Sequence, residues 1–102
     1  MKIIYCFSEV INQSTIMKKG ILNIGSKGFI IENEGFFCEF SKVINIEKIK
    51  INGMGTIIKI ETAEKHLFIT VPRLFINIGT GFAIINYFAT NKLYKNLIKM
   101  KS

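Results

Sequence analysis

Apolar and polar residues alternate over most of the first 71 residues, and this period of two constrains the fold more than any other feature. Ile58 and Ile60, for example, alternate with Lys59 and Glu61. A β-strand points successive side chains to opposite faces, so such alternation is typical of half-buried strands. The sequence therefore predicts a mainly β domain.

Turn residues separate the alternating runs. Asn52-Gly53 is the strongest signal, because a type I′ hairpin turn needs positive φ at both central residues. Residues 25–28 and 33–35 supply further turns, whereas Ala63-Glu64 is a weak turn sequence that predicts a longer loop. The connections are mostly short, so we expect an antiparallel meander. The predicted strands cover about residues 2–7, 16–24, 28–33, 36–40, 43–51, 55–62 and 65–71.

One predicted strand changes phase. Residues 43–51 alternate at both ends, but the apolar positions shift by one near Glu47-Lys48. One extra residue in a β-bulge produces such a shift. A bulge is therefore predicted near the middle of this strand.

The spacing of apolar residues changes near the C-terminus. Pro72 ends the last predicted strand, and apolar residues beyond residue 81 recur at four-residue steps, with Phe82 and Phe88 beside them. Thr80 is a candidate N-cap, so an amphipathic helix is predicted over about residues 80–99. Strands over about 2–71 and this helix make one domain, 1–102. The apolar stripe comprises Ile85, Ala89, Leu93 and Leu97.

Four segments in this order resemble the pleckstrin-homology-like (PH-like) superfold, especially small bacterial PH and GRAM-type domains. They are GILNIGSKGFIIEN (20–33), FSKVINIEKI (40–49), TIIKIET (56–62) and HLFITV (66–71). The resemblance implies a partly open antiparallel barrel of about seven strands capped by the C-terminal helix. It also implies a non-catalytic interaction or regulatory module.

A second resemblance covers shorter segments. IGSKGF (24–29) and IINYFATNKLYKNL (84–97) are similar to a family of small bacterial proteins encoded beside mannose-type sugar-transport operons. It implies, as an alternative, a regulator linked to such an operon.

The net charge of +7 and the pI near 9.6 favour an acidic partner. The charge is spread along the chain, and Arg73 is the only arginine, so forked recognition of phosphates is not indicated. Many PH-like domains bind phosphoinositides at the open end of the barrel. The loops expected there carry Lys65 as their only base, and their carboxylates would repel phosphate. These carboxylates belong to Glu9, Glu32, Glu34 and Glu64.

Two surfaces remain as candidates for binding. The apolar segment RLFINIGTG (73–81) lies between the last strand and the helix, and predicts an interface for a protein partner or for self-association. Its candidate residues are Leu74, Phe75, Ile76 and Ile78. The basic C-terminal residues could instead contact an anionic membrane surface. These are Lys92, Lys95, Lys99 and Lys101. Nucleic-acid binding is disfavoured, because most aromatic residues fall at core-facing positions.

The sequence gives little support for catalysis or metal binding. The chain contains no aspartate and one histidine, His66, which excludes a Ser-His-Asp triad, and a Ser-His-Glu version would need Glu61 or Glu64 nearby. If residues 62–65 close the hairpin, Glu61 and His66 lie opposite each other, a pairing that is more typical of cross-strand charge stabilisation. Cys6 and Cys38 lie in separate apolar runs, which is typical of buried thiols and does not form a metal-binding pair. We therefore predict that the protein is not an enzyme and has no catalytic residues, no metal and no cofactor.

The expected location is cytoplasmic, with peripheral attachment to a membrane as the alternative. No run approaches the roughly 20 apolar residues of a membrane-spanning helix. The opening run MKIIYCF has fewer consecutive apolar residues than the roughly seven of the shortest signal-peptide core.

Overall fold

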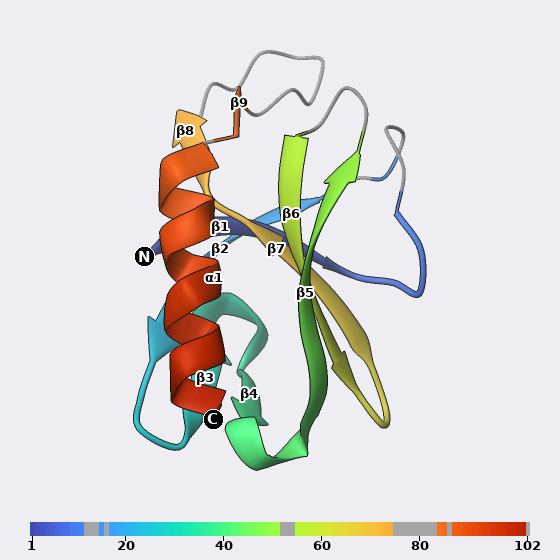
Figure 1. Ribbon diagram of the computed structural model, residues 1–102, viewed down its shortest axis with the longest axis vertical. Helices are drawn as coiled ribbons and strands as arrows, with labels where there is room; N and C mark the ends of the chain where they lie inside the picture. Colours follow the sequence, from blue (N-terminus) through green and yellow to red (C-terminus); the bar gives the residue numbers. More distant parts are fainter. Residues whose placement is uncertain (12–14, 16, 52–54, 75–83, 86, 102) are drawn as a thin grey trace.

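The computed structural model describes residues 1–11, 15, 17–51, 55–74, 84, 85 and 87–101. It confirms the predicted fold class: seven antiparallel strands form a curled half-barrel, and one helix follows at the C-terminus (Figure 1). The strands of the half-barrel are β1 (Lys2–Phe7), β2 (Lys18–Ile24), β3 (Gly28–Ile31), β4 (Phe36–Glu39), β5 (Val43–Ile51), β6 (Gly55–Thr62) and β7 (His66–Thr70). Two 3-10 helices, η1 (Glu32–Glu34) and η2 (Phe40–Lys42), lie on either side of β4.

The strand order is β4-β3-β2-β1-β7-β6-β5, so β1 joins the two halves of the sheet. Lys2 to Tyr5 pair with β2, and Ile4 to Phe7 pair with β7. In this order β4 and β5 are the two edge strands, which leaves the half-barrel open between them. The chain crosses that opening through η2.

Two apolar clusters stabilise the sheet from opposite faces. The larger cluster lies on the concave side and includes Leu93 and Leu97 of the helix. The smaller cluster lies on the other face and is built from Cys6, Ile57, Phe68 and Ile11. Because both faces are covered, β6 is apolar at successive positions, where Ile57 and Ile58 are both fully buried.

The second cluster explains why the predicted bulge is misplaced. The β5–β6 register is continuous from Asn45 to Ile51, and the irregularity lies between Val43 and Asn45. The apolar pattern shifts near Glu47 because Ile46 packs in the larger cluster, whereas Ile49 packs against the smaller one. A change of the buried face, without an inserted residue, produced the phase shift.

The hairpin between β6 and β7 is tighter than predicted. The Thr62 N–H donates to the carbonyl of Lys65 at 2.9 Å, which leaves only Ala63 and Glu64 in the loop. The Thr62 hydroxyl closes the turn further, since it donates to the Lys65 carbonyl and accepts from the Lys65 N–H, both at 3.0 Å. The Thr62 side chain thus provides hydrogen bonds that close the turn, although Ala63-Glu64 is a weak turn sequence.

The C-terminal helix starts later than predicted. Pro72 does not end the strand region but begins β8 (Pro72–Leu74), which pairs with β9 (Ile84–Ile85). The helix α1 then spans Tyr87–Lys101. Ile85 is therefore in a strand, and the predicted N-cap Thr80 lies outside the described residues.

Candidate functional site

The exposed side of α1 carries a row of side chains that we call the basic stripe: Phe88, Lys92, Lys95 and Lys99. At 3.6 residues per turn these positions fall on one side of the helix. The opposite side carries the buried residues Thr90, Leu93 and Leu97. The helix contains four lysines and no acidic residue, so no carboxylate of its own offsets the stripe.

Phe88 departs from the prediction made for it. Its side chain is 83% exposed, although the spacing indicated an apolar helix face. Tyr87, which is 51% exposed, packs against it with 5.6 Å between ring centroids. Two aromatic rings therefore lie in solvent at the first turn of α1, next to the lysines.

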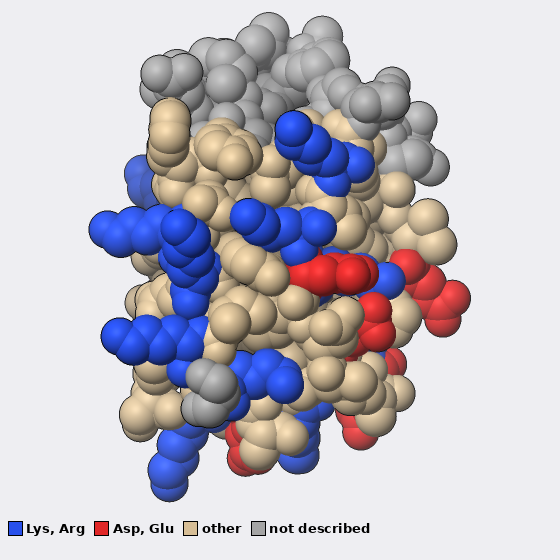
Figure 2. Space-filling model, in the orientation of Figure 1, with Lys and Arg blue, Asp and Glu red and all other residues tan. Residues whose placement is uncertain are grey.

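The neighbouring strand extends the basic surface. Lys48 of β5 donates from Nζ to Asn91 Oδ1 at 2.7 Å, and its ammonium lies 5.0 Å from the centroid of the Tyr94 ring. Lys50 follows two residues later on the same face of β5. Figure 2 shows Lys and Arg side chains gathered over α1 and beside it, whereas most of the acidic side chains visible in this view lie toward the other side.

The tertiary structure therefore adds Lys48 and Lys50 of β5 to the basic C-terminal residues that the sequence already groups. It brings Lys92, Lys95, Lys99 and Lys101 together on one helix and places β5 beside them. No local signal could have shown this, because β5 and α1 are about forty residues apart. The other predicted surface, residues 75–78, lies outside the described residues, and Leu74 is placed only as the last residue of β8.

The carboxylates expected to repel phosphate are partly neutralised. Glu34 Oε1 accepts from the Tyr5 hydroxyl at 2.7 Å and from Lys18 Nζ at 3.1 Å. These two donors lower the pKa of Glu34. Lys65 also lies nearby, with its Nζ 5.4 Å from the centroid of the Phe36 ring. No local pattern in the sequence indicates the contact of Lys18 with Glu34, because sixteen residues separate the two.

His66 does not form an arrangement that activates a nucleophile. Its Cα pairs with that of Glu61 as predicted, but the Glu61 carboxylate is bound by Lys59 at 3.2 Å. Among the described residues, His66 Nδ1 has no hydrogen-bond partner. Burial raises the pKa of both Cys6 and Cys38, which disfavours the reactive thiolate.

Within the described part of the chain, no group of three or more His, Cys, Asp or Glu side chains could hold a metal ion. None of the helices described there is long and apolar enough to cross a membrane. No protein-family model, no curated protein and no solved structure matches the chain.

Proposed function

We propose that the protein is a non-catalytic interaction module with a PH-like fold, and that it binds anionic membrane surfaces peripherally through α1. A half-barrel followed by a C-terminal helix supports this proposal, since it is the architecture that the PH-like resemblance implies. The observation that carries it is the basic stripe, with its exposed Tyr87–Phe88 pair at one end.

The chemistry of the stripe favours a membrane over nucleic acid. Each lysine held near an anionic surface contributes about 1 kcal/mol. Partial burial of Phe88 in the headgroup region adds at most about 1.5–3 kcal/mol. Three lysines and one ring therefore give weak, reversible attachment, as expected for a peripheral protein. Nucleic acid would need several exposed aromatic rings interleaved with the lysines, whereas the exposed rings of α1, Tyr87 and Phe88, lie at the first turn and Tyr94 is partly buried against the core.

Vesicle co-sedimentation tests the proposal, with phosphatidylserine–phosphatidylcholine vesicles compared with pure phosphatidylcholine at low and physiological salt. Lys92→Gln combined with Lys95→Gln should weaken binding about 30-fold, because two contributions of about 1 kcal/mol are lost. The matched control, Lys19→Gln with Lys65→Gln, removes the same charge from exposed residues outside α1 and β5, and should change binding less than about threefold.

The aromatic pair is tested separately. Phe88→Ser should weaken binding about tenfold or more at physiological salt, although the charge is unchanged. Phe37→Ser, at another exposed phenylalanine on β4, is its control. Membrane binding through α1 would be contradicted if the two double lysine variants lost vesicle binding equally. Tighter binding of the protein to a single-stranded oligonucleotide than to vesicles would also contradict it.

A further inference from the structure

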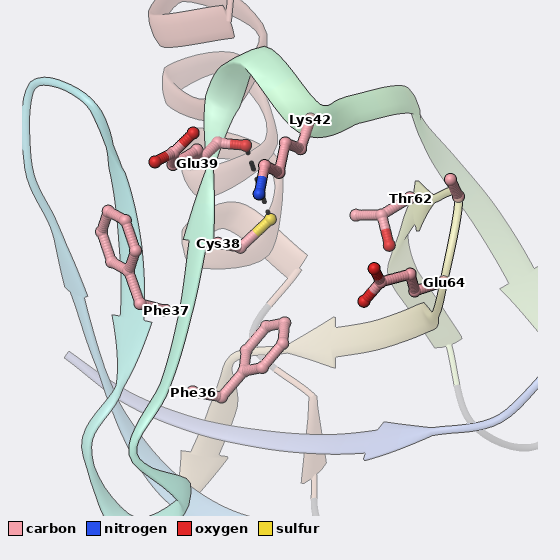
Figure 3. A pocket seen from close by; sticks show the side chains of 8 residues that line it. Phe36, Phe37, Cys38, Glu39, Lys42, Thr62 and Glu64 are labelled. Carbon is pink, nitrogen blue, oxygen red and sulfur yellow. Dashed lines mark hydrogen bonds between the residues drawn. The ribbon is translucent and has the colours of Figure 1, made fainter.

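The edge of β4 borders a slot that is separate from the basic stripe. The slot is a cavity of about 360 Å³ on the open side of the half-barrel. Figure 3 shows β4 along one wall, with Phe36 and Cys38 turned toward the cavity and Phe37 turned away. The lining residues are Phe36, Phe37, Cys38, Glu39, Lys42, Thr62, Ala63 and Glu64.

The register of the β3–β4 pairing shows which backbone groups of β4 point toward the slot. The Phe40 N–H donates to the carbonyl of Lys27 at 2.9 Å, in line with the β3–β4 pairing. Hydrogen-bonded pairs alternate in an antiparallel ladder, so Cys38 and Phe36 also bond to β3. The N–H groups of Phe37 and Glu39 and the carbonyl of Phe37 therefore point away from β3, and no other described strand pairs with this edge. The carbonyl of Glu39 already accepts from the Cys38 thiol, with 3.7 Å between Sγ and the oxygen (Figure 3).

We propose that the slot binds an extended peptide segment, which adds to β4 as an antiparallel strand. The N–H groups of Phe37 and Glu39 and the carbonyl of Phe37 would bond to its main chain, as in other cases of strand addition. Because β4 has four residues, a segment of about four residues matches it.

The residues that line the slot indicate which side chains the bound peptide should carry. Side chains on the inner side would meet Phe36 and Cys38, so they should be apolar. Side chains on the outer side would lie beside Glu39, and Glu64 stands on the opposite wall. Among the lining residues two carboxylates face one ammonium, that of Lys42, so a lysine or arginine is favoured at the outer positions. The partner is thus a peptide with alternating apolar and basic residues.

A second copy of this chain fits the slot less well. In a folded copy β4 is paired with β3, so both strands would have to enter the slot, and two adjacent strands occupy a width of about 10 Å. Thr62, Ala63 and Glu64 close the slot on that side, and a cavity of about 360 Å³ does not hold two strands.

The probe is an acetylated and amidated heptapeptide of alternating lysine and valine, titrated into the ¹⁵N-labelled protein and followed by NMR. The amide signals of Phe37 and Glu39 should shift, with a Kd of about 1 mM or tighter. N-methylation of the lysine amides should abolish binding, because in antiparallel pairing those residues bond to β4. N-methylation of the valine amides should not abolish it.

Glu39→Pro tests the protein side without breaking the sheet. Glu39 has φ −75° and ψ 138°, close to the angles that proline adopts, and its N–H points away from β3. This variant should fold normally and bind at least tenfold more weakly, whereas Glu39→Gln, which keeps the N–H, should lose less than threefold.

The proposal would be overturned by no binding to the wild type, by equal binding to Glu39→Pro, or by equal effects of the two N-methylated peptides. A wild-type dimer that Glu39→Pro converts to a monomer would also overturn it, by assigning the edge to a second copy.

Discussion

The hydroxyl of Tyr5 is the polar group on which the packing of η1 depends. Tyr5 is fully buried, and its hydroxyl donates to Glu34 and accepts from Asn33 Nδ2, each at 2.7 Å. Burial first, and the bond to Glu34 second, raise the pKa of Tyr5 to about 12. Gly20 leaves room for the ring, since a Cβ there would lie 2.6 Å from Tyr5 Cε1. This ring therefore ties η1 to β1 and β2.

Tyr5→Phe should lower the free energy of unfolding by about 0.5–1.5 kcal/mol at neutral pH, because the hydrogen bonds of the buried hydroxyl are lost while Glu34 and Asn33 are exposed and can bond to water instead. The raised pKa means that the contribution of Tyr5 ionisation is fully present below pH 10.0 and lost as the pH rises toward about 12. Denaturant unfolding at increasing pH should therefore show an alkaline loss of stability that is smaller in Tyr5→Phe. A loss of the same size in both proteins would contradict the assignment.

Glu34 has the opposite dependence on pH. Its pKa is lowered in the folded protein, so its contribution is present above the ordinary value of 4.5 and lost as the pH falls through the lowered value. Glu34→Gln should unfold with a weaker dependence on pH in the acid range. Glu9→Gln, at an exposed carboxylate outside this network, is the control and should keep the wild-type profile.

Gly28 marks the closest approach of β3 to β4. A Cβ at Gly28 would collide with the carbonyl of Cys38 and lie 2.9 Å from Glu39 Cα, and both are backbone atoms that cannot rotate away. Gly28→Ala should therefore cost about 1–3 kcal/mol in thermal or denaturant unfolding. At Gly25 the same methyl would lie 3.6 Å from its nearest neighbour, so Gly25→Ala should stay within about 0.5 kcal/mol. Equal costs at both sites would show that the contact does not limit the sheet.

At the scale of elements, α1 is fixed to the sheet by a buried threonine pair as well as by apolar packing. Thr90 Oγ1 accepts from the Val71 N–H at 3.1 Å and lies 3.2 Å from Thr70 Oγ1. The Thr70 hydroxyl in turn donates to the Thr56 carbonyl at 2.9 Å. These bonds set the rotation of the helix, and therefore decide that the basic stripe faces solvent.

Thr90→Val keeps the shape of the side chain but leaves the Val71 N–H without its acceptor. We expect a loss of about 1–3 kcal/mol in unfolding free energy. Asn96→Ala, at an exposed position of the same helix, should change it by about 0.5 kcal/mol or less. If the two variants were equally stable, apolar contacts alone would hold α1.

At the scale of the whole molecule, the two apolar clusters share their strands. Ile57 and Ile58 are consecutive residues of β6, yet they belong to clusters on opposite faces of the sheet. Neither cluster can be lost without disrupting β6. The half-barrel should therefore unfold as one unit.

Ile57→Val and Ile58→Val should each lower the stability by about 0.5–1.5 kcal/mol. Each should shift the same single transition, seen alike by far-UV circular dichroism and by tyrosine fluorescence. Two separate transitions, or a variant that moves only one probe, would show that the clusters unfold independently.

Local sequence patterns are sufficient to predict the number, order and approximate bounds of the seven strands of the half-barrel. Alternation, turn residues and strand preference act over a few neighbouring residues, and each is visible locally. The same is true of the Glu61–His66 pairing, which follows from the β6–β7 hairpin. The prediction was wrong at the β6–β7 turn, because the Thr62 side chain supplies closing hydrogen bonds that Ala63-Glu64 does not indicate.

Only the tertiary structure decided which surfaces are available for binding. A helical period indicates an apolar face but not its limits, and Phe88, which the pattern places beside the apolar stripe, is 83% exposed. The position of β5 beside α1, the bond from Lys18 to Glu34 and the unpaired edge of β4 all join residues distant in the chain or depend on strand order. Such relations arise from packing of the whole sheet, and no short window of sequence contains them.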